Sequence, residues 1–312
     1  MAECPGAPVK QFKSYAKQIE LLESRGMQIS NRAEAMQTLQ NVSYYRLSGY
    51  WYSFRKLKAD ETGRTDSFIE GSSFSEVLSL YEFDARLRTA VLRSLEPIEL
   101  AFRARLGHVL GESDPLIHLK PESLGPQAKG NSDGASQRYL KWRSNYDCEL
   151  ARSREDFVNH HNQKYGGRLP VWAAVEILDW GGLTHLFGMA PQGVRNSMAG
   201  DLGLTGPQLE SWMKSLNIVR NTAAHNGRLF NRVYTLTPRL PRQNQDNPLL
   251  TLTGVMNRCF GQLSLIQYLL HHLKIGNYRL LPAVLQTYPP DCLVPLSHTG
   301  TPNNWISHPL WN

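Results

Sequence analysis

The chain has 312 residues, of which 41% are hydrophobic and 20% are charged. This balance is too apolar for a disordered protein and too polar for a bundle of membrane helices. No stretch approaches the roughly 18 apolar residues that a membrane-spanning helix needs, and the first residues lack the pattern of a signal peptide. We therefore expect a cytoplasmic protein of one large or two smaller domains, with no membrane partner.

The positive charge is concentrated in one segment of the chain. The net charge is +7, and residues 211–290 hold a single acid, Asp246, while the rest of the chain is close to neutral. Clustered positive charge attracts a polyanion through phosphate contacts and counterion release, so nucleic acid is the first partner to consider. An ordinary basic surface is the alternative. The basic residues of this segment are Lys214, Arg220, Arg228, Arg232, Arg239, Arg242, Arg258, Lys274 and Arg279.

Cysteine and histidine placement predicts no metal site and no cofactor. Four widely spaced cysteines without a CxxC pair indicate reduced thiols rather than a disulfide framework or a zinc site. The histidine clusters, His160-His161 and His271-His272, are pairs of neighbours, and neighbours on a helix point about 100° apart. That is a poor geometry for one metal ion, for which helical zinc sites use a spacing of four.

Helical signals dominate the sequence and predict an all-α fold. Capping boxes at Asn31/Glu34, Ser73/Glu76 and Thr205/Gln208 each precede an apolar pattern with helical spacing. The pattern after Ser73 predicts a long helix with a kink at Pro97. Other apolar runs predict an opening helix containing Phe12, Tyr15, Ile19 and Leu22 and stopped by Gly26, a buried helix over 171–178 ended by Gly181-Gly182, and a late helix over 263–273.

Residues 44–52 form an aromatic stretch with two interpretations. It contains four tyrosines and one tryptophan within nine residues. The side chains are either a stacking surface for bases or packed core, and core is favoured because aromatic residues dominate core energetics.

The segment Arg220-Asn221-Thr222-Ala223-Ala224-His225 ends the helix that Thr205 begins. At about 100° per residue, Arg220, Asn221 and His225 share one arc spanning about 140°, beside the apolar stripe of Leu209 and Trp212. Arg228 falls on the same arc if the helix continues past Gly227. Imidazole exchanges protons near neutral pH and guanidinium binds two phosphate oxygens at once, which suits cleavage of RNA without a metal. The 2′-hydroxyl would attack, His225 would move protons, and Arg220 would neutralise the phosphoryl charge.

The spacing of Arg and His alone is a weak signal, since Arg103 to His108 has it too. On spacing alone the favoured interpretation is structural: Arg220 pairs with a carboxylate and His225 complements a helix C-terminus. Around the motif, the predicted contacts to the RNA backbone are Lys214, Arg228, Arg232, Arg239 and Arg242.

Ordered matches to one family run nearly from end to end, in residues 41–50, 80–88, 98–99, 169–172 with Glu176, 220–225, 228–232 and the closing Gly300, Pro302, Trp305 and Leu310-Trp311. In these segments the chain resembles the abortive-infection (Abi-like) family of bacterial defence proteins, in the AbiD/AbiF branch, and through it the HEPN superfamily of ribonucleases. Asn226 stands where the family often has a second His, and Phe230 where it often has Trp.

Asp84 and Arg88 lie one helical turn apart. They are either an ion pair, which we favour, or residues that support the site.

The resemblance implies a HEPN-like helical bundle and a composite active site where the motif helices of two copies meet, hence a homodimer. It also implies a toxin whose activity is restrained until infection, with a small noncoding RNA as one possible inhibitor. We expect an N-terminal helical extension over 1–70, the HEPN-like domain over 71–290, and an irregular tail over 291–312 packed on that domain. Three functions are carried forward: a metal-independent endoribonuclease, a noncatalytic RNA-binding regulator, and a structural or nucleotide-sensing helical module.

Overall fold

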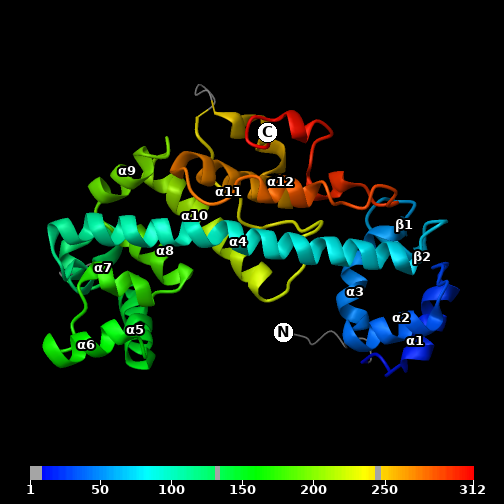
Figure 1. Cartoon of the computed structure of the whole chain (residues 1–312), viewed down its shortest axis with the longest axis horizontal. Helices are drawn as coiled ribbons and strands as arrows, with labels where there is room; N and C mark the ends of the chain where they lie inside the picture. Colours follow the sequence, from blue (N-terminus) through cyan, green and yellow to red (C-terminus); the bar gives the residue numbers. More distant parts are fainter. Residues whose placement is uncertain (1–8, 131–133, 243–246) are drawn as a thin grey trace, which may run out of the picture. The chain divides into compact units, whose positions relative to one another are not determined.

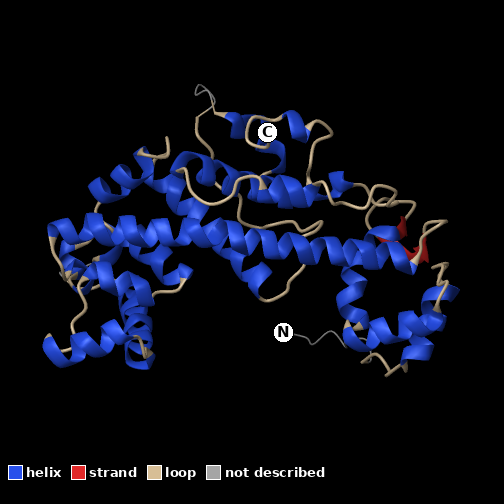
Figure 2. Cartoon of the chain, in the orientation of Figure 1, coloured by secondary structure: helices blue, strands red, loops and turns tan. Residues whose placement is uncertain are grey.

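The computed structural model describes residues 9–130, 134–242 and 247–312. The all-α prediction is confirmed, because helices make up most of these residues and the one sheet has two short strands (Figure 2). The α-helices are α1 Tyr15–Ser24, α2 Arg32–Asn41, α3 Tyr44–Trp51, α4 Phe74–Ser113, α5 Gln137–Arg152, α6 Asp156–Lys164, α7 Val171–Ala174, α8 Trp180–Met189, α9 Gln192–Gly200, α10 Gly206–Ala224, α11 Cys259–Leu273 and α12 Leu280–Leu285.

Short 3₁₀ helices and a hairpin complete the secondary structure. Strands β1 Arg55–Leu57 and β2 Arg64–Phe68 pair antiparallel, with Arg55 opposite Phe68. The 3₁₀ helices are Tyr52–Phe54, Ile117–Leu119, Pro121–Ser123, Pro126–Ala128, Val175–Ile177, Pro248–Val255, Leu296–Thr299 and Trp305–Ser307. In the described part of the chain, no helix combines the length and the apolar character required to cross a bilayer.

The chain divides into two compact units. The first contains Met1–Ala85 and Thr287–Leu296, and its core is formed by apolar residues of α1 to α3 such as Leu22, Leu47 and Trp51. The second contains Arg86–Gln286 and Ser297–Asn312.

In the second unit, α10 contacts α8, α9 and α11 (Figure 1). The last part of the tail, Ser297–Asn312, also belongs to this unit: the Trp311 ring stacks on Phe260 of α11, and its Nε1 donates to Ser264 Oγ at 3.1 Å. The second unit therefore surrounds α10 with helices on several sides.

The structure departs from the sequence prediction in three helices, and capping explains the first two departures. The first helix begins at Tyr15, because Ser14 caps it, and this leaves Phe12 outside the helix and 93% exposed. The Gly181-Gly182 pair does not end a helix: it lies in the first turn of α8, where Asp179 Oδ1 accepts from the N–H of Gly182 at 2.6 Å. The long helix α4 continues through Pro97 to Ser113, drawn as one ribbon in Figure 1.

Candidate functional site

The helix α10 carries the predicted catalytic residues and is anchored along its length. The Thr205/Gln208 capping box is confirmed at its start. Trp212 and Leu216 are fully buried, Trp180 Nε1 donates to the carbonyl of Met213 at 2.8 Å, and Ser215 Oγ donates to Gln262 Oε1 on α11 at 2.7 Å. These contacts fix the rotation of α10 about its axis, and therefore the direction in which its polar arc points.

The C-terminal end of α10 is a Schellman motif. The N–H of Asn226 donates to the carbonyl of Ala223 at 3.1 Å, and the N–H of Gly227 donates to that of Thr222 at 2.7 Å. Asn226 has a left-handed backbone with φ of 54°, a conformation that asparagine adopts more readily than most residues. The helix therefore stops at Ala224, and the placement of Arg228 on the helical arc is wrong, because Arg228 lies in the chain that turns away.

Arg220, Asn221 and His225 lie on the accessible side of this helix end. The Arg220 side chain is 39% exposed, and its Nη1 donates to Asn221 Oδ1 over a long 3.5 Å. Asn221 and His225 are exposed. The structure thus brings Arg220 and Asn221 together, whereas no hydrogen bond or ion pair between described residues joins His225 to Arg220 within one chain.

Glu99, which was not predicted as a site residue, is the carboxylate that faces Arg220. Glu99 Oε2 lies 4.0 Å from Arg220 Nε, while the other oxygen accepts from Arg103 one turn later on α4. Arg103 is buried and also donates to the carbonyls of Val175 and Glu176, which fixes the carboxylate in place. Two signals for this cluster are present in the sequence: the four-residue spacing of Glu99 and Arg103, and the place of Glu99 among the segments that match the family.

Both features of the structural interpretation are therefore present. Arg220 faces a carboxylate and His225 is the C-cap residue of α10. The separation of 4.0 Å exceeds a hydrogen bond, however, and Glu99 already has Arg103 as a closer partner. Arg220 has five N–H donors on an accessible side chain, so the pairing leaves donors that can reach a phosphate.

A comparison with protein families identifies the chain. Residues 37–231 match the model of the family described as Abi-like protein, which is more than half of the chain and includes Arg220, Asn221 and His225. The chain belongs to the Abi-like family. It is thus a protein of the abortive-infection type. No curated protein and no solved structure matches it.

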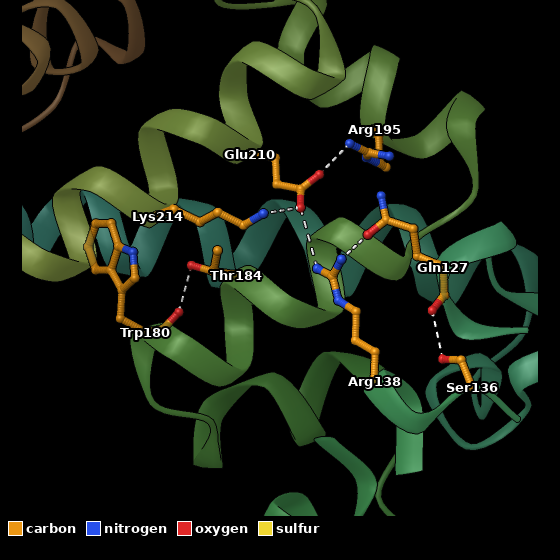
Figure 3. Close-up of polar contacts among 8 residues, drawn as sticks. All are labelled: Gln127, Ser136, Arg138, Trp180, Thr184, Arg195, Glu210 and Lys214. Atoms are coloured by element: carbon orange, nitrogen blue, oxygen red, sulfur yellow. Dashed lines mark hydrogen bonds and ion pairs between the residues drawn. The ribbon is translucent and has the colours of Figure 1, made fainter. Parts of the chain in front are cut away.

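In this Abi-like protein, Lys214 belongs to an ion cluster around Glu210 (Figure 3). The Glu210 side chain is 9% exposed. Its Oε1 lies 3.3 Å from Arg138 Nη2 and 2.7 Å from Lys214 Nζ, and its Oε2 lies 2.6 Å from Arg195 Nη2. Burial opposes ionisation of Glu210, but the hydrogen bond from Lys214 and the three positive charges outweigh it and hold the pKa of Glu210 below its usual value. Three cations share one carboxylate, so the cluster keeps an excess positive charge, and Lys214 itself is 42% exposed.

The chain after the motif runs back beside α10. Trp212 Nε1 donates to the carbonyl of Arg239 at 2.8 Å, and the N–H of Arg239 donates to Ser211 Oγ at 3.0 Å. These bonds place Arg239 near the start of α10, about 14 Å of helix from Arg220. Arg239 and Arg242 are exposed. The structure therefore does not gather Arg239 around Arg220, and an RNA touching both must extend over several nucleotides.

The remaining predicted contacts, Arg228 and Arg232, lie between Arg220 and Arg239 in the sequence. Arg232 is half-buried, with its guanidinium 5.6 Å from the centre of the Tyr234 ring, and Arg228 is half-buried as well. Leu229 and Phe230 between them are fully buried and fix the turn to the core.

The paired histidines are used in contacts with the protein backbone. His161 Nδ1 lies 2.7 Å from the carbonyl of Phe157, and His272 Nδ1 lies 2.9 Å from that of Tyr268. Over residues 9–130, 134–242 and 247–312, no three His, Cys, Asp or Glu side chains come together as a group that could hold a metal ion. Cys148, Cys259 and Cys292 are free thiols, and Cys4 lies outside the described residues.

Proposed function

We propose that this Abi-like protein is a metal-independent endoribonuclease of abortive-infection defence, with Arg220, Asn221 and His225 as its catalytic residues. The observation that carries the proposal is the end of α10. There an arginine, an amide and an imidazole are accessible to solvent on a helix that is otherwise locked into the core. The resemblance of this segment to HEPN ribonucleases supports the same assignment.

The proposed reaction needs only groups that the chain and the RNA provide. The imidazole of His225 takes the proton of the 2′-hydroxyl, and the 2′-oxygen forms a bond to the adjacent phosphorus. The bond from phosphorus to the 5′-oxygen breaks as the imidazolium of His225 returns a proton to that oxygen, which leaves as a 5′-hydroxyl and restores the neutral imidazole. Arg220 stabilises the charge that develops on the phosphoryl oxygens, and Asn221 holds the guanidinium from one side.

The proposed active unit is a homodimer. Arg220 and His225 are about 140° apart on the end of one helix, so a single phosphate is reached more readily by Arg220 of one copy and His225 of another. A two-fold axis near the end of α10 would create two such composite sites. Ile218, which is exposed on the same side of α10, is an apolar contact for that interface.

The reaction is tested by its products and by chelation of metals. We expect purified protein to cleave labelled RNA at full rate in EDTA and to leave 2′,3′-cyclic phosphate and 5′-hydroxyl ends, because the 2′-oxygen is the nucleophile. Ends with 3′-hydroxyl and 5′-phosphate, or activity that EDTA removes and magnesium restores, would refute the mechanism. RNA that binds and stays intact would instead favour a noncatalytic regulator.

A second prediction concerns the proposed contacts to the RNA backbone. Changing Arg239 or Arg242 to Gln is expected to weaken binding regardless of sequence. Each change should reduce the slope of log affinity against log salt by about 0.7, because one phosphate contact is lost. Fluorescence anisotropy at several salt concentrations, with the noncleaving His225→Ala protein, measures this slope. Arg93→Gln, an exposed arginine on α4, is the matched control and should keep the full slope. Binding that is flat in salt would contradict the assignment.

A further inference from the structure

The first unit contains a groove of about 840 Å³ that the Arg220 site does not involve. We call it the N-terminal groove; its walls include residues 10–13 before α1, Tyr15 at its start, Arg25 after it, and Tyr44 and Tyr45 of α3. Its volume lies in the range of sites that hold small ligands, about 300 to 1,000 Å³, which suits one or two nucleotides at a time.

The N-terminal groove is lined by exposed aromatic rings. Phe12, Tyr15 and Tyr45 are exposed, with Tyr45 at 69%. Tyr45 is held in position because its neighbour Tyr44 packs edge-on against the buried Trp51 at 4.8 Å, and the two tyrosine rings lie 6.0 Å apart. The aromatic stretch is therefore divided: Tyr50 and Trp51 are core, as favoured from the sequence, while Tyr45 offers its ring to a ligand.

The charge of the groove has one sign. Lys10, Lys13 and Arg25 line it, and none of the acidic residues that the structure describes does. Arg25 shares the carboxylate of Asp66 with Arg55, at 2.8 Å and 3.1 Å. Lys10 and Lys13 are exposed, and Lys10 Nζ lies 5.8 Å from the centre of the Tyr45 ring. A cation beside an exposed ring is the combination that binds a base and its phosphate together.

A buried acceptor in the groove also lacks a partner. Gln18 Nε2 donates to the carbonyl of Lys13 at 2.9 Å, but Gln18 Oε1 is buried without a hydrogen bond from any described residue. A buried acceptor left unpaired is costly, so a ligand with a donor would stabilise the site. RNA has such donors in its 2′-hydroxyls as well as its base amino groups, whereas DNA has only the latter.

We propose that the N-terminal groove binds single-stranded RNA, with a base stacked on Tyr45, phosphates beside Lys10 and Lys13, and a 2′-hydroxyl or base amino group donating to Gln18. The groove is a second RNA contact, separate from the residues that cleave. The rings, the lysines and the unpaired acceptor carry the assignment to nucleic acid, and the choice of RNA as the natural ligand rests also on the proposed function.

The test measures binding without cleavage. In the His225→Ala background, the affinity for a fluorescein-labelled oligouridylate is expected to fall about tenfold on Tyr45→Ala, since one stacked base is lost. Tyr45→Trp should retain the affinity because it restores a ring, and this variant separates stacking from folding. Lys10→Gln and Lys13→Gln should each reduce the salt slope by about 0.7.

The matched control is Tyr52→Ala, an exposed tyrosine of the same stretch that does not line the groove; it should change the affinity less than twofold. Oligothymidylate and duplex RNA should bind more weakly than oligouridylate. Equal affinities for Tyr45→Ala and Tyr52→Ala would overturn the proposal. So would a Tyr45→Ala protein that binds RNA normally but sediments with a different mass, since the groove would then hold a second copy of the chain.

The outcome is distinguishable from failure of the proposed function. A parent protein that cleaves no RNA, with Tyr45→Ala still weakening binding, would leave the groove assignment standing. If the parent protein cleaves RNA and the Tyr45→Ala protein binds RNA normally, the proposed RNA binding by the groove would be refuted, and the proposed ribonuclease activity would stand.

Discussion

The His225→Ala protein is expected to cleave RNA at least about 100-fold more slowly than the unmodified chain, with RNA affinity changed less than about twofold. The imidazole transfers protons only as the reaction proceeds, and general acid–base catalysis contributes about 10² to 10⁴ to the rate. His225 is exposed and follows the last turn of α10, so its truncation removes little packing. Single-turnover cleavage of labelled RNA, beside an anisotropy titration of the same RNA, measures both quantities.

His160→Ala is the matched control, because His160 is also an exposed histidine on a helix and lies outside the proposed site. It should cleave at the normal rate. A His225→Ala protein as active as this control would remove His225 from the mechanism.

A second cleavage experiment tests whether Arg220 and His225 of one site come from different copies of the chain. Arg220→Ala should reduce both cleavage and RNA affinity, since a fixed cation acts on the bound phosphate before and during reaction. Mixing the two inactive variants should restore up to about a quarter of the activity, because half of the dimers would then contain one intact pair of Arg220 and His225 from different copies. A mixture that stays inactive, although the subunits exchange, would place both residues of each site in one chain.

The start of α10 and the segment in which it ends were predictable from the sequence, but the residue that stops the helix was not. Thr205 and Gln208 form a local capping box, which depends on a few neighbouring residues and so can be read from them. The stop is made by Asn226 in the left-handed conformation, with Gly227 one position later than the usual capping glycine. A Cβ at Gly227 would lie 2.9 Å from the carbonyl oxygen of Thr222, so a glycine is needed there for close approach. The sequence shows the glycine but not which helix position it occupies.

The partners of Arg220 and Lys214 could not be predicted from the sequence, for a different reason. Glu99 lies 121 positions before Arg220 in the chain, so no periodicity joins them. The pair exists because the part of α4 that carries Glu99 belongs to the same unit as α10. From the sequence, Lys214 could be identified only as one of the basic residues of the segment 211–290. Its carboxylate, Glu210, lies one turn away just before that segment, and the net charge of the segment conceals the pairing.

The cluster around Glu210 has a large expected effect on stability. The buried carboxylate of Glu210 lies between the positive charges of Arg138, Arg195 and Lys214. Gly188 of α8 leaves room for this cluster, because a Cβ at that position would lie 2.3 Å from Arg138 Nη2. Removing one partner of a buried ion pair costs about 3 to 5 kcal/mol, because it leaves uncompensated charge. Lys214 is partly exposed and its charge is screened, so we expect Glu210→Gln to lower the free energy of unfolding by about 2 to 3 kcal/mol.

Urea denaturation at pH 7, followed by tryptophan fluorescence, measures this loss, with Glu96→Gln as the control that breaks an exposed pair with Arg93 and should cost under about 0.5 kcal/mol. The difference between the parent and the Glu210→Gln protein should also depend on pH in one direction. The pKa of Glu210 is lower in the folded chain than its usual 4.5, so its contribution is complete above that value and is lost as the pH falls toward the folded pKa. Equal midpoints for the two variants, or a difference that is constant from pH 7 to pH 3, would show that Glu210 does not stabilise the fold as an ionised carboxylate.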